Sequence, residues 1–179
     1  MIYYWLHIAY VFFGSKYFWS EVDMLSDFSR ERKVSLLDCE AFRFMANSKY
    51  FYYMDLIRLE LLFRSPLYEQ TVKKKMFPVI GSQKIIYKKP LKRWSKFRIT
   101  LVLEGWDDKW VYHKQVFTQG DVVCAIGYTK IAFWRKHKVQ SMSDIIFKCG
   151  VTQKTKEVSK PVLNLFENDS NFLRGENTF

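Results

Sequence analysis

The sequence predicts an α+β domain in which a curved antiparallel sheet wraps around one long apolar helix. Residues 48–64 form a helical stretch that is apolar almost all the way round, and such helices are usually buried. From Pro78 onward the hydrophobic period changes to two, which is typical of strands. Tight turns at 105–108 and 120–121 join these strands into an antiparallel meander. A sheet with one buried face is expected to curl around the single apolar helix.

Length and composition favour one folded domain in a reducing compartment. The chain has 179 residues, of which 49% are hydrophobic and 18% aromatic, so it can build a core. Cys39, Cys124 and Cys149 are scattered, which argues against a disulfide framework and favours a cytoplasmic protein. The three histidines show no ligand-like spacing, so no metal site is expected.

The net charge of +11 predicts a polyanionic partner. Nucleic acid, anionic lipid and a phosphate-bearing small molecule all fit, and charge alone does not choose among them. Much of the charge lies in a block without acids, which comprises Lys73, Lys74, Lys75, Lys84, Lys88, Lys89, Lys92, Arg93, Lys96 and Arg98. A solvated basic rim without a specific ligand is the alternative interpretation of this block.

The segment 1–29 is expected to be an N-terminal appendage. Residues 1–13 are an apolar run that ends at Gly14, too short to span a bilayer and without the features of a secretory signal. We expect an opening helix packed on the domain or on a partner subunit. An interfacial membrane anchor is the alternative, because Tyr and Trp suit the headgroup layer.

The main domain is expected to span residues 30–150 and to begin with a strand at 34–37. Asn47 and Ser48 are both good N-cap residues, so the long helix should start at one of them. It should stop by Ser65, because Pro66 disfavours a helical conformation in the residue before it.

The second half of the domain is expected to contain strands at 79–88, 96–106, 110–118 and 122–134. In the clearest of them one face carries only apolar residues: Phe97, Ile99, Leu101 and Leu103. A short helix is expected at 141–149. Residues 151–179 are polar and charge-balanced, which predicts a loosely attached tail with a short helix near 162–166.

The residues in front of the long helix resemble a motif of the hotdog-fold acyl-CoA thioesterases. The branch that includes thioesterase superfamily member six shows Asp-x-Asp-x-x-x-His-Met-Asn-Asn-x-x-Tyr at this place. The chain has the same spacing, with matches at Asp38, Met45, Asn47 and Tyr50. It is similar to that branch again at 54–58, 79–83 and 105–109. The resemblance runs from residue 1 to about 134 and implies the hotdog fold.

The chain departs from the motif at three positions. Glu40 stands where the family has its catalytic Asp, Phe44 replaces the His, and Ala46 replaces the first Asn. The resemblance implies that Glu40 acts as general base or nucleophile. Asp38 and Asn47 are the other candidate catalytic-site residues; we expect Asp38 to orient the loop and Asn47 to cap the helix. The alternative interpretation of Glu40 is an exposed loop acid or a charge at the helix terminus.

The other expected site residues are backbone donors and surface cations. The amides of Phe44, Met45 and Ala46 would hold the oxyanion of a thioester. Coenzyme A, as part of the substrate, would place its phosphates on four basic residues near Pro90: Lys88, Lys89, Arg93 and Lys96. No metal and no other cofactor is expected.

Four further residues are expected to have structural rather than catalytic roles. Asp55 and Arg58 are three apart on the helix and are expected to form a structural ion pair. His113 is expected on the sheet surface, flanked by Tyr112 and Lys114. Cys124 is expected to be an inert core thiol.

The function expected from the resemblance is hydrolysis of a fatty or other acyl-CoA in a homodimer or larger homo-oligomer, with possible membrane-surface contact. A catalytically degenerate hotdog protein that binds acyl-CoA or a protein partner is the alternative. Nucleic-acid binding is disfavoured because no recognisable nucleic-acid module is present.

Overall fold

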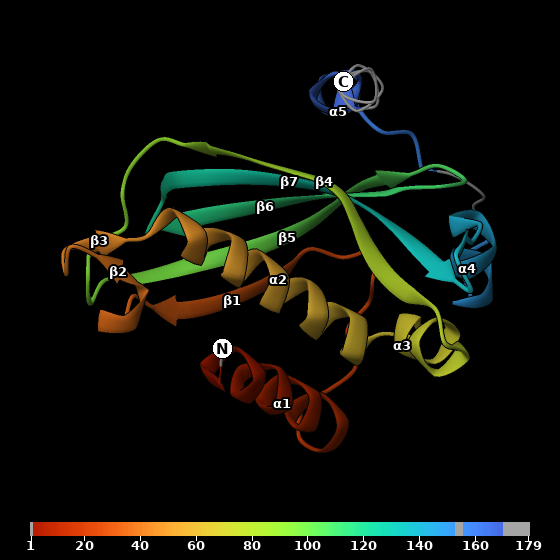
Figure 1. The fold of residues 1–179 in the computed structure, drawn as a ribbon, viewed down its shortest axis with the longest axis horizontal. Helices are drawn as coiled ribbons and strands as arrows, with labels where there is room; N and C mark the ends of the chain where they lie inside the picture. The colour runs from red at the N-terminus through yellow and green to blue at the C-terminus, as the bar shows by residue number, and fades with distance from the viewer. Residues whose placement is uncertain (1, 153–155, 170–179) are drawn as a thin grey trace, which may run out of the picture.

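In the computed structural model of the chain, an antiparallel sheet curves around one central helix (Figure 1). The structure describes residues 2–152 and 156–169. Neighbouring strands follow the order β1-β5-β6-β7-β4, with β8 (Lys138–Val139) beside β7. The larger strands are β1 (Phe28–Lys33), β4 (Phe77–Tyr87), β5 (Lys96–Trp106), β6 (Val111–Gln119) and β7 (Val122–Arg135). The predicted α+β architecture is confirmed.

Helices pack around this sheet, and a small two-stranded hairpin precedes the longest of them. The long helix α2 (Asn47–Arg64) lies against the concave face of the sheet (Figure 1). The helices are α1 (Ile2–Tyr17), α2 (Asn47–Arg64), α3 (Leu67–Gln70), α4 (Met142–Lys148) and α5 (Lys160–Phe166). The shorter elements are η1 (Leu36–Asp38), β2 (Cys39–Glu40), β3 (Phe44–Met45) and η2 (Val72–Lys74).

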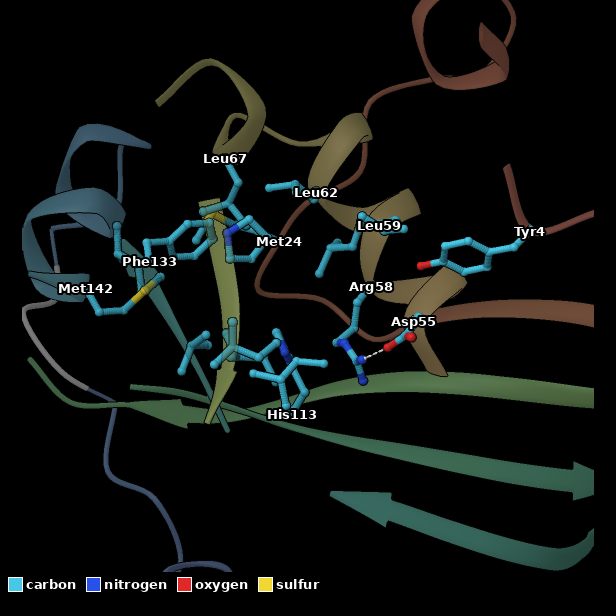
Figure 2. A pocket seen from close by; sticks show the side chains of 17 residues that line it. Tyr4, Met24, Asp55, Arg58, Leu59, Leu62, Leu67, His113, Phe133 and Met142 are labelled. Carbon is cyan, nitrogen blue, oxygen red and sulfur yellow. Dashed lines mark hydrogen bonds and ion pairs between the residues drawn. The ribbon is translucent and has the colours of Figure 1, made fainter. Parts of the chain in front are cut away.

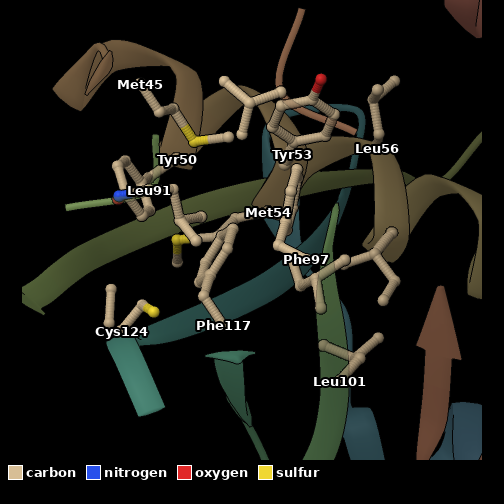
Figure 3. Close-up of a cluster of buried hydrophobic side chains, with 14 of the residues drawn as sticks. Met45, Tyr50, Tyr53, Met54, Leu56, Leu91, Phe97, Leu101, Phe117 and Cys124 are labelled. Carbon is tan, nitrogen blue, oxygen red and sulfur yellow. The ribbon is translucent and has the colours of Figure 1, made fainter. Parts of the chain in front are cut away.

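The core lies between α2 and the inner face of the sheet (Figure 3). The alternating residues of β5 predicted to face inward are all buried, which confirms that strand and its orientation. Opposite them, Tyr50 and Met54 of α2 are buried. Met54 crosses β7 at Gly127, where an added Cβ would lie 2.4 Å from the Met54 Cε atom. Glycine therefore allows the helix to approach the sheet this closely.

The first strand begins earlier than the sequence predicts. Residues 34–37 were expected to form it, but β1 is Phe28–Lys33 and pairs antiparallel with β5, Phe28 opposite Leu101. Charged residues 30–33 obscure the strand because β1 is a sheet edge, where charged side chains reach solvent. Arg30 turns inward and forms an ion pair with the buried Glu60 of α2.

The start of α2 also differs from the prediction. The N-cap is Ala46, in extended conformation and without a side-chain hydrogen bond, and Asn47 is already helical. Neither Asn47 nor Ser48 caps the helix. The amide of Ala46 donates to the Asp38 carbonyl oxygen at 2.8 Å, so a tertiary contact sets the boundary in place of a capping side chain.

Helix α1 packs on α2, as expected for an opening helix. The ring centroids of Phe12 and Phe63 lie 5.3 Å apart, and Val11 is buried. The other side of α1 stays exposed although it is apolar: Trp5, Leu6, Tyr10, Phe13 and Tyr17 are each more than half exposed. Within the described ranges, no helix combines the length and apolar character that a bilayer crossing requires.

The described part of the C-terminal tail is packed on the sheet rather than loosely attached. Val162 and Phe166 of α5 are buried, and the ring of Phe166 lies 6.0 Å from that of Tyr112 on β6. Asp169 forms ion pairs with Lys84 and Lys130 on the sheet, at 3.0 and 2.9 Å. The predicted short helix is confirmed, whereas residues 170–179 of the expected tail lie outside the described part.

Candidate active site

The β2–β3 hairpin stands directly before α2 and carries Glu40 at its turn. The amide of Arg43 donates to the Glu40 carbonyl, and Ala41 and Phe42 between them have φ values of 46° and 57°. Two positive φ values match the twist of a tight hairpin turn, although residues other than glycine adopt them at a cost. The Glu40 side chain is exposed and has no hydrogen bond or ion pair with the described part of the chain.

Asp38 is the buried acid of this region. Its Oδ2 atom accepts hydrogen bonds from the Ser35 amide at 2.9 Å, the Ser35 hydroxyl at 2.7 Å and the Tyr53 hydroxyl at 2.9 Å. Lys49 Nζ lies 3.4 Å from Oδ1. These partners join the hairpin to the first two turns of α2. Asp38 is thus positioned to orient the hairpin rather than to reach a substrate, because its side chain is fully buried.

Two of the three amides expected to hold an oxyanion are already engaged. The Met45 amide donates to the Leu91 carbonyl at 2.9 Å, and the Ala46 amide donates to the Asp38 carbonyl. The third residue, Phe44, lies opposite Glu40 in the hairpin. At the N-terminus of α2, the exposed Asn47 and Ser48 have no acceptor for their amides within the described residues. These two N–H groups lie at the positive end of the helix dipole, where unpaired amides can bind an anion.

The β4–β5 connection brings the expected phosphate-binding cations beside this hairpin. The Arg93 amide donates to the Arg43 carbonyl at 2.9 Å, and Lys92 forms a β-bridge with Phe44. The amides of Lys88 and Lys89 both donate to the Cys124 carbonyl, which fixes the end of β4. The side chains of the four candidates, Lys88, Lys89, Arg93 and Lys96, are all exposed.

A second polar group lies under the middle of α2, away from the hairpin. Asp55 and Arg58 form the expected ion pair, and Arg58 Nη1 donates to Thr129 Oγ1 on β7 at 3.0 Å. When the side-chain amides of Gln83 and Gln115 are oriented so that both oxygen and nitrogen have partners, their oxygens lie 3.0 and 3.2 Å from Arg58 Nη1. The guanidinium is therefore surrounded by acceptors. Burial lowers its pKa to about 10, so it stays charged at neutral pH.

His113 belongs to this buried group, so the expectation that it lies on the sheet surface is wrong. It shares the inner face of β6 with Val111, Gln115 and Phe117, all buried. Because His113 and Gln115 are polar, the sequence of β6 does not show an alternating apolar face, and the buried face was not recognised. Burial, with a smaller contribution from the Arg58 charge, lowers the pKa of His113 to about 3. The ring is neutral at physiological pH.

The thiol of Cys124 is shielded from reactants. Cys124 is fully buried, as expected for a core thiol, and burial raises its pKa. Among residues 2–152 and 156–169, no group of three or more His, Cys, Asp or Glu side chains is arranged to hold a metal ion.

A family model described as thioesterase-like superfamily matches residues 34–164. The match covers more than half of the chain and includes the hairpin, α2 and the sheet from β4 to β8. Among curated proteins, a probable thioesterase of Saccharomyces cerevisiae, YBR096W, is 25% identical over 151 residues. The match covers 82% of this chain, which spans 65% of the length of the yeast protein.

Solved structures, a probable thioesterase among them, share the fold. The probable thioesterase YbaW from Escherichia coli superposes with a TM-score of 0.63 at 18% identity, covering 67% of this chain and 94% of that chain. The hypothetical protein SAV2348 from Staphylococcus aureus, solved in complex with CoA, gives 0.61 at 12% identity and covers 73% and 85% of the two chains. The predicted hotdog fold is confirmed.

Acid should destabilise the wild type more than a His113→Phe variant. The native pKa of about 3 lies below that of an unfolded histidine, about 6.5, so between these values the unfolded state binds the extra proton. Falling pH therefore lowers the free energy of unfolding by about 1.4 kcal/mol per unit in this window, roughly 2 kcal/mol between pH 6.5 and 5. Urea unfolding across this range measures the slope.

The phenylalanine variant also has an aromatic ring but cannot bind a proton, so it should lack the part of the acid dependence that comes from His113. A His137→Asn variant is the matched control, because His137 is exposed in the β7–β8 turn and should leave the slope unchanged. Equal acid losses in the wild type and His113→Phe would contradict the assignment.

Proposed function

The chain belongs to the thioesterase-like superfamily, and we propose that it hydrolyses the thioester of a fatty or other acyl-CoA at the junction of the β2–β3 hairpin and α2. One observation carries this proposal: an exposed carboxylate, two available backbone amides and a cluster of surface cations share one end of the molecule. Of the family's branches, the one that includes thioesterase superfamily member six fits best, because Asp38, Met45, Asn47 and Tyr50 match its motif.

In the proposed reaction the thioester carbonyl oxygen lies against the amides of Asn47 and Ser48. Glu40 takes a proton from a water molecule as the water oxygen attacks the carbonyl carbon. The amides and the helix dipole stabilise the negative charge on the tetrahedral intermediate. Its collapse breaks the C–S bond, and the proton passes from Glu40 to the coenzyme A thiolate. Direct attack by Glu40 to give an anhydride is the alternative route.

The cations of the β4–β5 connection are proposed to bind the phosphates of coenzyme A. Lys88, Lys89 and Arg93 follow the end of β4 and Lys96 begins β5, so all four flank a loop tied to the hairpin. Their exposed charges suit a 3′-phosphate and a pyrophosphate. The structural neighbour solved in complex with CoA gives support at the level of the fold.

We propose that the active form is a homodimer or larger homo-oligomer joined at β4. In the described sheet β4 is an edge strand, paired on one side only, with β7. Apolar side chains along it are exposed: Phe77, Val79, Ile80, Ile86 and Tyr87. A long apolar edge strand invites pairing with another chain, and a second copy would cover it.

We also propose that the exposed side of α1 binds the surface of an anionic membrane. The apolar stripe Leu6, Tyr10, Phe13 and Tyr17 recurs at helical spacing, and residues 2–17 contain no acid. Its aromatic rings suit the headgroup region, and the net charge of +11 favours anionic lipid. Contact with a membrane would bring the enzyme close to long-chain acyl groups.

A catalytically degenerate protein that binds acyl-CoA is the second candidate, and the replacements in the motif favour it. Phe44 and Ala46 stand where the motif has His and Asn, and the amides of Met45 and Ala46 are occupied. Such a protein would bind acyl-CoA at the basic loop without releasing thiol.

Replacing Glu40 by Gln should lower the rate of thiol release from acyl-CoA by at least about 100-fold, because the amide cannot accept the proton. Glu40→Asp, which restores the family's residue, should retain more activity than Glu40→Gln because it keeps a base, although displacing the carboxylate by one methylene can itself cost up to about 100-fold. Release is followed with a thiol reagent over a panel of chain lengths, with each protein alone as blank because the chain has three free cysteines.

Glu69→Gln is the matched control, since Glu69 is an exposed carboxylate on α3 and should not affect the rate. Equal rates for wild type and Glu40→Gln would remove Glu40 from the mechanism. Binding of CoA without any release by the wild type would establish the degenerate protein instead.

Membrane binding should depend on the stripe of α1. Replacing both Leu6 and Phe13 by Ser removes apolar surface that is exposed in the free protein, so folding should be retained. The partition coefficient onto phosphatidylserine-containing vesicles should fall by at least about tenfold, as expected for losing two apolar side chains that the membrane would bury. Leu163→Ser, an exposed position on α5, is the control. Equal co-sedimentation of all three proteins would refute membrane binding through α1.

A further inference from the structure

Three loop segments meet at one end of the molecule, beside the β2–β3 hairpin (Figure 1). The Trp94 amide donates to the Val34 carbonyl at 2.8 Å, and the Arg93 amide donates to the Arg43 carbonyl at 2.9 Å. These bonds join three segments, which together form the loop tip: residues 33–37, 42–43 and 92–94. The segments therefore lie side by side although they are far apart in the sequence.

Four apolar side chains of the loop tip are exposed to solvent. The exposed fractions are 42% for Leu36, 67% for Leu37, 70% for Phe42 and 53% for Trp94. Exposed apolar residues that occur singly are normal on protein surfaces. A group of four on adjoining loops instead indicates an interaction surface.

Two of these residues have a backbone conformation that is unfavourable for bulky side chains. Phe42 has a φ of 57° and Trp94 a φ of 66°, in the left-handed region that favours glycine. Each of these positions therefore carries both backbone strain and an aromatic ring that faces water. Strain of this kind persists mainly at functional surfaces, where the side chain is used in a contact.

Positive charge surrounds the apolar group. Residues 33–43 and 88–96 contain seven Lys or Arg side chains against two acids, and one of those acids, Asp38, is fully buried. Lys33 Nζ lies 5.5 Å from the centroid of the Trp94 ring. Three exposed cations of the loop tip are not among those proposed to bind coenzyme A: Lys33, Arg43 and Lys92.

The loop tip is not the mouth of a ligand cavity. A cavity of about 240 Å³ lies between the C-terminal half of α2 and the sheet, with a mostly apolar wall and with Asp55 and Arg58 at one end (Figure 2). Asp55 is the first residue of α2 that lines it, eight positions after Asn47 and about 12 Å along the helix axis. The residues that line it include none from the loop tip. The exposed side chains of the tip are therefore available to a surface outside the chain.

The proposed contact between copies at β4 involves the other edge of the sheet. In the strand order β1-β5-β6-β7-β4, the strands β1 and β5 lie at the edge opposite β4. The segment 33–37 continues from the end of β1, and Trp94 precedes the start of β5 by two residues. Pairing at β4 therefore does not explain the exposed apolar residues of the loop tip.

We propose that the loop tip is a docking surface for an anionic lipid bilayer, with Leu37, Phe42 and Trp94 inserted into the headgroup layer. Tryptophan rings favour the membrane interface, and the apolar side chains gain free energy by leaving water there. The surrounding Lys and Arg side chains attract anionic headgroups. Nucleic acid would use the same cations but would leave the leucines in water.

Docking through the loop tip would hold the proposed thioester site at the membrane surface, because Glu40 belongs to the same hairpin. The loop tip is distinct from the exposed side of α1. The inference depends neither on α1 nor on thioester hydrolysis.

Co-sedimentation with vesicles of an equal mixture of phosphatidylcholine and phosphatidylserine tests the proposal without any substrate. A double variant, Leu37→Ser with Phe42→Ser, removes apolar surface that is exposed in the free protein, so folding should be retained. The partition coefficient should fall by at least about tenfold. Phe147→Ser, at a position on α4 that is 66% exposed, is the matched control and should leave the coefficient unchanged. Equal coefficients for the wild type and the double variant would overturn the proposal.

The cations of the loop tip give a second test that leaves the apolar side chains in place. Lys33→Gln with Lys92→Gln should lower the partition coefficient onto the phosphatidylserine-containing vesicles by at least about fivefold. Binding to phosphatidylcholine alone should stay the same. Lys138→Gln with Lys148→Gln is the matched control, because these exposed residues lie on β8 and α4. Equal losses from the two pairs would mean that net charge alone drives binding, which would overturn the loop tip as the docking surface.

Two further measurements exclude other occupants of the loop tip. Soluble glycerophosphoserine should not displace the protein from vesicles, and competition would indicate a headgroup pocket instead of a docking surface. In lipid-free solution the wild type and the Leu37→Ser, Phe42→Ser variant should sediment with the same mass. A smaller mass for the variant would assign the loop tip to a contact between copies and overturn the proposal.

The variants also separate this proposal from the earlier ones. If Leu6→Ser with Phe13→Ser binds vesicles as the wild type does, α1 loses its assignment while the loop-tip variants still decide this one. Thiol release plays no part in these assays, so a chain that hydrolyses no acyl-CoA gives the same readout.

Discussion

The buried carboxylate of Asp38 holds the hairpin in front of α2, and the geometry of the site depends on it. It accepts from Ser35 on the hairpin side and from Tyr53 on the helix, with Lys49 beside it. The backbone carbonyl oxygen of Asp38 accepts a hydrogen bond from the Ala46 amide and so sets where α2 begins. A fully buried acid with these partners fixes both backbones and leaves the next acid, Glu40, exposed at the turn.

The helix that the sheet encloses has two different halves. Its N-terminal half packs against an apolar core, with Met54 beside Gly127. Its C-terminal half carries Arg58, paired with Asp55, and borders a cavity that His113 also lines. The proposed reaction site and this cavity therefore lie at opposite ends of one helix.

Sequence patterns predicted the parts of the fold whose signals are local. The alternation in β5 and the turn glycine Gly120 specify the meander without reference to distant residues. The first strand was misplaced because β1 is charged and its partner β5 lies about 70 residues further along the chain. The burial of His113 and the engaged amides of Met45 and Ala46 depend on tertiary contacts that no local pattern contains.

The central claim is that a thioester carbonyl binds the amides of Asn47 and Ser48 while coenzyme A lies on the neighbouring basic loop. Backbone NMR with an acyl-CoA analogue tests it directly. In this analogue a methylene group replaces the thioester sulfur, so the thioester becomes a ketone that is not hydrolysed. The largest amide shifts are expected at Asn47 and Ser48, followed by residues 88–93. Shifts confined to the basic loop or to the cavity, with Asn47 and Ser48 unmoved, would contradict the account.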